Sequence, residues 1–87
     1  MANLYSGGTY SFTGYKTLSE LTGLTFVENK VYTVQIKSDS SYYVREGTEG
    51  IGFEDSEHKP FTWTYDGIND LYIGNTHGNS IYINVAS

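Results

Sequence analysis

The chain has 87 residues, no cysteine, and ten acidic against five basic residues, which gives a net charge of -5 at pH 7. A domain of this size buries only about 60% of the surface of its unfolded chain, so a deep catalytic cleft is not expected, and singly scattered Lys and Arg residues exclude the basic patch of a nucleic-acid-binding protein. The absence of cysteine excludes a disulfide framework and a thiolate metal site, and no apolar run reaches the ~20 residues of a membrane span.

Residues 1–8 are predicted to form a flexible or partner-docked N-terminal arm, and residues 9–87 a single β-domain. The arm carries Leu4 and Tyr5 and ends in a pair of glycines, which leave the backbone free to bend. No basic, apolar leader is present, so we expect a soluble protein that is not exported by a signal peptide.

A strand is predicted over residues 9–13, because apolar and polar residues alternate there. One short helical turn is predicted near residues 17–22. Thr17 and Glu20 have the spacing of a capping box, and Gly23 is a suitable stop. Two leucines three positions apart in this turn share a face, so we expect the turn to plug one end of the core.

Residues 31–37 alternate between apolar and polar side chains, which predicts a half-buried strand. We expect this strand to form a hairpin with residues 42–46. In that pairing Val44 lies opposite Ile36. Tyr43 and Arg45 then face outward, because the other register would bury the arginine.

The stretch from residue 47 to residue 60 is irregular and acidic, and it includes Glu54, Asp55, Glu57 and His58. The spacing matches neither an EF-hand loop nor a zinc signature, so we expect a solvated loop without a metal or cofactor. The chain also lacks a nucleophile elbow and any recognisable nucleophile with its base. We therefore expect no enzymatic activity; a hydrolase that uses Glu54, Asp55 and His58 is the distant alternative.

The last three predicted strands are interpreted as a meander. Pairing Ile73 with Ile81 buries both side chains and places Tyr72 directly opposite Tyr82 on the outer face. The inner face is expected to comprise Phe61, Trp63, Tyr65, Leu71, Ile73, Ile81, Ile83 and Val85. Six or seven short strands in total predict an all-β fold, either a compact antiparallel β-sandwich or a partly open barrel.

Two groups of residues are candidates for binding. The first is an interaction surface expected to comprise Tyr72, Tyr82, Thr64, Asn84, Leu4 and Tyr5. Tyrosine combines a flat apolar ring with a hydroxyl at small entropic cost, so this surface suits a partner protein or a sugar, unless a second sheet or the arm covers the rings. The second is a loop with Asn75, His77 and Asn79, which either contact a ligand or meet the backbone needs of a turn.

The segments VYTVQIK, YYVREG, G-x-G-F, LYI and IYINVAS resemble those of small β-rich structural proteins of tailed bacteriophages, such as head-fibre, decoration and tail-associated proteins. The resemblance implies a virion protein that is made in the host bacterial cytoplasm and binds other virion proteins or copies of itself, for instance as a trimer. The long coiled coil or repeat shaft of a fibre is absent. The first hypothesis is therefore a non-catalytic docking module that binds neither nucleic acid nor membrane. The alternative is a carbohydrate-binding module that recognises a cell-surface glycan.

Overall fold

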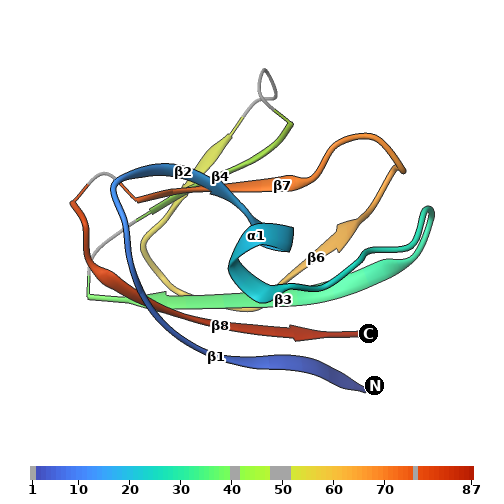
Figure 1. Cartoon of the computed structure of the whole chain (residues 1–87), viewed down its shortest axis with the longest axis horizontal. Helices are drawn as coiled ribbons and strands as arrows, with labels where there is room; N and C mark the ends of the chain where they lie inside the picture. Colours follow the sequence, from blue (N-terminus) through green and yellow to red (C-terminus); the bar gives the residue numbers. More distant parts are fainter. Residues whose placement is uncertain (1, 40–41, 48–51, 76) are drawn as a thin grey trace.

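The fold is a sandwich of two sheets. The computed structural model describes residues 2–39, 42–47, 52–75 and 77–87. In these residues, eight strands form two four-stranded antiparallel sheets that pack face to face (Figure 1). The predicted all-β sandwich is therefore confirmed, with eight strands in place of the six or seven expected.

Sheet A contains, in spatial order, β1 (Asn3–Ser11), β8 (Ser80–Ala86), β3 (Val31–Ser38) and β6 (Phe61–Thr64). Over most of their length, its central strands alternate between buried and more exposed residues, as expected for strands with one face on a core. Ile36 of β3 pairs with Ile83 of β8. Aliphatic side chains from two neighbouring strands therefore meet on the inner face of this sheet.

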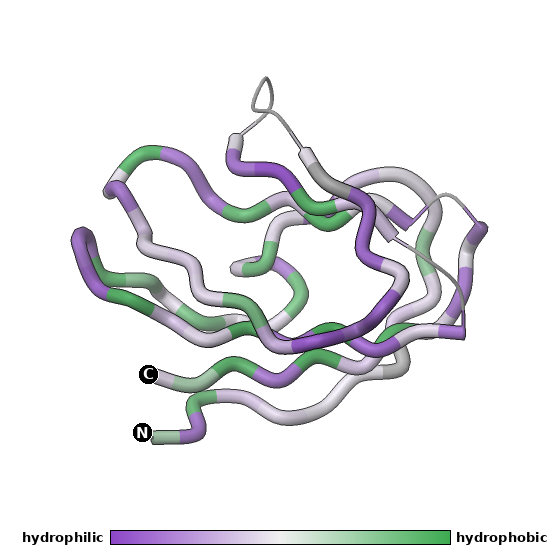
Figure 2. Tube along the Cα trace, turned by 180° about the vertical axis from the view of Figure 1, so that it is seen from behind, coloured by the Kyte–Doolittle hydropathy of each residue, from purple (hydrophilic) through white to green (hydrophobic). Residues whose placement is uncertain are grey.

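Sheet B contains, in spatial order, β2 (Gly14–Thr17), β7 (Leu71–Asn75), β4 (Tyr42–Glu46) and β5 (Phe53–Asp55). Val44 of β4 pairs with Ile73 of β7, and both side chains are fully buried. Short hydrophobic and hydrophilic stretches follow one another along the chain (Figure 2). The inner faces of the two sheets together form the core, and all eight side chains predicted for the inner face belong to it or pack against it.

Helix α1 (Leu18–Thr22) is the predicted helical turn. The Thr17 side chain accepts a hydrogen bond from the Glu20 backbone N–H, and Gly23 ends the helix in the left-handed conformation. Leu18 and Leu21 are buried in the core, as predicted. Among the described residues, no helix is long and apolar enough to cross a membrane.

The predicted hairpins are wrong. Among the described strands, β4 and β5 are the only consecutive pair that lie side by side, and every other connection passes from one sheet to the other. Tyr72 pairs with Thr17 and Arg45 in sheet B, whereas Tyr82 pairs with Gly8 and Lys37 in sheet A. Alternation along a strand predicts which face is buried. It does not predict which strand is the neighbour, because the inner faces of both sheets have the same pattern.

The predicted pairing of residues 31–37 with residues 42–46 is wrong for the same reason. Ile36 lies beside Ile83, and Val44 lies beside Ile73 in the other sheet. The Tyr42 hydroxyl oxygen nevertheless lies 3.0 Å from the Ile36 carbonyl oxygen. The two strands therefore contact each other across the sandwich instead of along a ladder.

The predicted N-terminal arm is also wrong. Residues 3–11 form β1, an edge strand of sheet A that pairs along its length with β8 of the same chain. The expected hinge at Gly7 and Gly8 lies inside this strand, and Gly8 packs directly on the backbone of β8. Backbone hydrogen bonds between Ala2 and Ser87 continue the pairing, so the two termini lie side by side (Figures 1 and 2).

Candidate binding face

The residues of the predicted interaction surface lie on two opposite faces of the sandwich. Tyr82, Asn84 and Thr64 belong to the outer side of sheet A, whereas Tyr72 belongs to the outer side of sheet B. Both tyrosines point away from the core, as predicted, but they are not neighbours. The prediction failed because it depended on the pairing of β7 with β8, which the structure does not contain.

The two residues predicted from the arm have different environments. Leu4 is exposed on β1, whereas Tyr5 packs against the core and its hydroxyl is hydrogen-bonded to the hydroxyl of Tyr10. The hydrogen bond with Tyr5, and secondarily burial, raise the pKa of Tyr10 to about 12. Tyr5 is therefore part of the internal packing of this edge and not of a binding surface.

Because of this tyrosine pair, the stability of the fold is expected to decrease with pH in the alkaline range. The folded chain holds the Tyr10 proton more tightly than the unfolded chain, in which tyrosine has a pKa of ~10. The resulting stabilisation is fully present below pH ~10 and is lost as the pH rises toward 12. We expect an ultraviolet titration of Tyr5→Phe to show one tyrosine ionising at lower pH than in the wild type. If the tyrosines that remain in Tyr5→Phe ionised at the same pH as in the wild type, the hydrogen bond would be contradicted.

Two residues of the predicted ligand loop, Asn75 and Asn79, hydrogen-bond to each other. Asn75 is 1% exposed, and its side-chain amide donates to the carbonyl of Asn79 and accepts from the backbone N–H of Asn79. Asn75 thus meets the needs of a turn, which is the alternative expected for it. His77 is exposed and Asn79 is half-buried beside it. Neither of two hollows lined by described residues includes a residue of this loop.

Four side chains on the outer side of sheet B form the best candidate site. Tyr15 of β2 and Tyr43 of β4 both pair with Gly74 of β7, so the two tyrosines flank this glycine in one row across the sheet. Arg45 pairs with Tyr72 in the adjacent row. We call Tyr15, Tyr43, Tyr72 and Arg45 the tyrosine face.

Gly74 fixes the position of the Tyr15 ring. A Cβ atom on Gly74 would lie 2.5 Å from Cε1 and 2.7 Å from Cζ of Tyr15, so the ring rests on the bare backbone of β7. Gly74 is buried as a result, although it faces outward. Tyr15 itself remains 43% exposed. The ring is thus held in place and still presents surface to a ligand.

Arg45 lies against two of these rings. Its Cζ atom is 4.1 Å from the ring centroid of Tyr15 and 5.9 Å from that of Tyr72. Both distances are within the range of a cation–π interaction. Arg45 forms no ion pair with the described part of the chain, and its buried Nε has no hydrogen-bond partner there. The charge of this arginine is therefore positioned by aromatic rings and not by a carboxylate.

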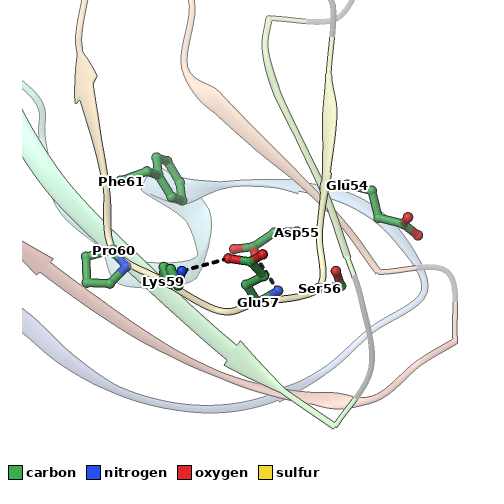
Figure 3. A pocket seen from close by; sticks show the side chains of 7 residues that line it. All are labelled: Glu54, Asp55, Ser56, Glu57, Lys59, Pro60 and Phe61. Atoms are coloured by element: carbon green, nitrogen blue, oxygen red, sulfur yellow. Dashed lines mark hydrogen bonds and ion pairs between the residues drawn. The ribbon is translucent and has the colours of Figure 1, made fainter.

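The described part of the acidic stretch includes a buried carboxylate, which the sequence did not predict. A hollow of about 320 Å³ is lined by every residue from Glu54 to Phe61 except His58 (Figure 3). Asp55 is 9% exposed, in contrast to the solvated loop that we expected. Its carboxylate accepts hydrogen bonds from Tyr42 and from the backbone N–H groups of Glu57 and His58.

These contacts leave little capacity for chemistry in the hollow. Glu57 forms an ion pair with Lys59, and the Glu54 side chain points away from the other side chains (Figure 3). No cluster of three metal-ligating side chains occurs in the described ranges. The ring of His58 packs beside that of Tyr42, and its Nδ1 is buried without a hydrogen-bond partner among the described residues. This arrangement does not place His58 and two carboxylates around a common reacting atom.

Sequence reasoning anticipated part of the tyrosine face and missed the rest. It placed Tyr43, Arg45 and Tyr72 on an outer face, which is where they lie. It missed Tyr15, because residues 14–17 were not recognised as a strand. The segment GYKT is short and begins with glycine, so its alternation is too brief to identify a strand. The chain shows no significant match to any protein-family model, curated protein or solved structure.

Proposed function

We propose that the chain is a non-catalytic carbohydrate-binding module that recognises glycans through the tyrosine face. The observation that carries this proposal is the gathering of three outward tyrosines and a stacked arginine on one open sheet. A sugar ring has a face of C–H groups and an edge of hydroxyls. Tyrosine rings complement the first, and phenol and guanidinium groups complement the second.

The composition of the face favours a glycan over a protein. Protein interfaces usually contain an apolar core that excludes water. Among side chains that the structure describes, the large exposed aliphatic residues are Leu4, Val27, Val31 and Ile68. None of them belongs to a strand of sheet B. The tyrosine face therefore offers aromatic and polar groups without the aliphatic surface that a protein partner would bury.

Tyr43→Ala is expected to weaken glycan binding by at least about tenfold, because aromatic anchors dominate the energy of such sites. Tyr82→Ala is the matched control: Tyr82 is 44% exposed and Tyr43 39%, on opposite faces of the sandwich. Binding is measured on a glycan array and then by calorimetry with the strongest ligand. Loss of binding in Tyr82→Ala with normal binding in Tyr43→Ala would refute the assignment.

A second variant tests whether the packing of Tyr15 on Gly74 matters for binding, and it leaves all four side chains of the tyrosine face in place. Gly74→Ala introduces a methyl group into the space of the Tyr15 ring. The obstructing atoms belong to a side chain that can rotate away, so we expect a stability loss below about 1 kcal/mol. Binding should still fall, because Tyr15 is displaced. Unchanged glycan affinity in this variant would show that the position of Tyr15 is unimportant.

A structural docking module remains the second candidate, as the resemblance to phage virion proteins implies. It is favoured by Leu4, Val31 and Tyr82, which are exposed in the strands of sheet A by 38%, 54% and 44%. Exposed apolar groups in a small domain often mark contacts with other subunits. Docking of this kind predicts a stable oligomer by light scattering at micromolar concentration, which Val31→Lys disrupts. A strict monomer would count against self-association.

A further inference from the structure

The charge of Arg45 indicates a more specific ligand class for the proposed site. We infer that the tyrosine face selects glycans that carry carboxylates, such as chains of uronic acids, and that Arg45 binds the carboxylate. This inference rests on the proposed function, because it assumes that the face binds sugars. It adds a chemical requirement that the three tyrosines alone would not impose.

Arg45 has the properties of a preorganised carboxylate ligand. The guanidinium is a planar group with several N–H donors that matches a carboxylate in a two-pronged geometry, and it stacks well on aromatic rings. Stacking on Tyr15 holds it in place before a ligand arrives. Within the described residues, no carboxylate forms an ion pair with Arg45. Its Nε is buried, so a ligand would contact the guanidinium through the terminal N–H groups. A ligand carboxylate would supply the missing negative charge.

Two other buried side-chain nitrogen atoms lack a hydrogen-bond partner in the described part of the chain, but neither indicates a second ligand-binding site. These are Nδ1 of His58 and Nε1 of Trp63. Trp63 is 3% exposed and its ring lies among other aromatic rings of the core. His58 belongs to the segment that encloses Asp55. Arg45 is the member of this group that lies on the open face of a sheet.

The net negative charge of the protein does not prevent this interaction. Exposed charges farther than about 8 Å apart are largely screened at physiological salt. Glu54 is an acidic residue on the same side of the sheet, and it pairs with Tyr43 in the row that does not contain Arg45. Local contacts with Arg45 therefore decide whether a carboxylate-bearing glycan binds more tightly than a neutral one. Glu54 should oppose an anionic ligand, so its neutralisation provides an independent test.

The test uses oligogalacturonate and its methyl ester, which have the same sugar rings with and without the charge. Hyaluronan and alginate oligomers, each with its carboxyl-reduced form, extend the comparison to other uronic acids. We expect at least one acid to bind about tenfold more tightly than its neutral partner. Arg45→Gln should abolish this preference, so that the acid and its neutral partner bind this variant with equal affinity. Glu54→Gln should strengthen binding of the acid alone, and added salt should weaken it.

The possible outcomes separate this inference from the proposed function. Equal binding of charged and neutral forms, unaffected by Arg45→Gln, would overturn the role of the carboxylate and leave a neutral glycan site. Failure to bind any glycan would overturn both proposals. Poly-glutamate serves as a carboxylate polymer without sugar rings, and binding of this polymer alone would overturn both proposals as well. Arg45→Lys keeps the positive charge but lacks the planar group that stacks on tyrosine. We expect this variant to prefer the acid over its neutral partner less strongly than the wild type does. Complete rescue by lysine would overturn the two-pronged geometry.

Discussion

Replacing Gly8 by alanine is expected to lower the free energy of unfolding by about 3 kcal/mol, which is the upper end of the usual cost of overpacking. A Cβ atom at this position would lie 2.4 Å from the carbonyl oxygen of Ile81 and 2.7 Å from Cα of Tyr82. Both are backbone atoms of β8, which is held between β1 and β3. Neither β1 nor β8 can move away from the added methyl group without breaking backbone hydrogen bonds to its neighbouring strand. For a domain with a typical stability of 5–15 kcal/mol, this is a large loss.

Gly7→Ala is the matched control for this prediction. The alanine Cβ would lie 3.5 Å from the Tyr5 hydroxyl oxygen, which is an ordinary contact. We expect a change below about 1 kcal/mol, measured for both variants by urea unfolding. Had residues 1–8 been a free arm, the two substitutions would have equally small effects. Equal stability of Gly7→Ala and Gly8→Ala would therefore contradict the pairing of β1 with β8.

Tyr42→Phe is expected to destabilise the fold by about 2 kcal/mol, because it removes a donor from a buried carboxylate. Tyr42 is 1% exposed, and its hydroxyl lies 3.0 Å from the Ile36 carbonyl of sheet A and is hydrogen-bonded to the Asp55 carboxylate of sheet B. Burial and then Asp55 raise the pKa of Tyr42 far above its ordinary value. The hydroxyl thus remains a neutral donor that joins the two layers of the sandwich.

Tyr43→Phe is the control for Tyr42→Phe, since the adjacent hydroxyl belongs to a side chain that is 39% exposed. It should change the unfolding free energy by less than about 0.5 kcal/mol. The double variant Tyr42→Phe with Asp55→Asn should lose less stability than the sum of the single variants, because the two groups interact directly. Additive losses would exclude the interaction between Tyr42 and Asp55.

Local features of the fold could be predicted from the sequence because they depend on nearby residues. Thr17, Glu20 and Gly23 define both ends of α1, and this arrangement is confirmed. The inward faces of the strands were also predicted correctly, since alternating apolar residues lie on one side of a strand wherever its neighbours are. These predictions required no knowledge of how distant strands pair.

The candidate site depends on strand neighbours and therefore was predicted only in part. Tyr72 was expected to contact Tyr82, but it lies beside Arg45, because β7 inserts between β2 and β4. The loops are short enough for tight hairpins, yet nearly all of them cross between the sheets. Alternation does not distinguish these two arrangements. The contact of Tyr15 with Gly74 was missed because it joins residues from strands that are distant in the sequence.

The most direct test of the central claim is a map of amide chemical shifts on titration with the glycan that binds most tightly. If the tyrosine face is the binding surface, the largest changes will occur at Tyr15, Tyr43, Arg45, Tyr72 and Gly74, on three adjacent strands of sheet B. Residues on the outer side of sheet A, such as Thr33 and Tyr82, should remain unchanged. Changes centred on sheet A, with none in sheet B, would contradict the account.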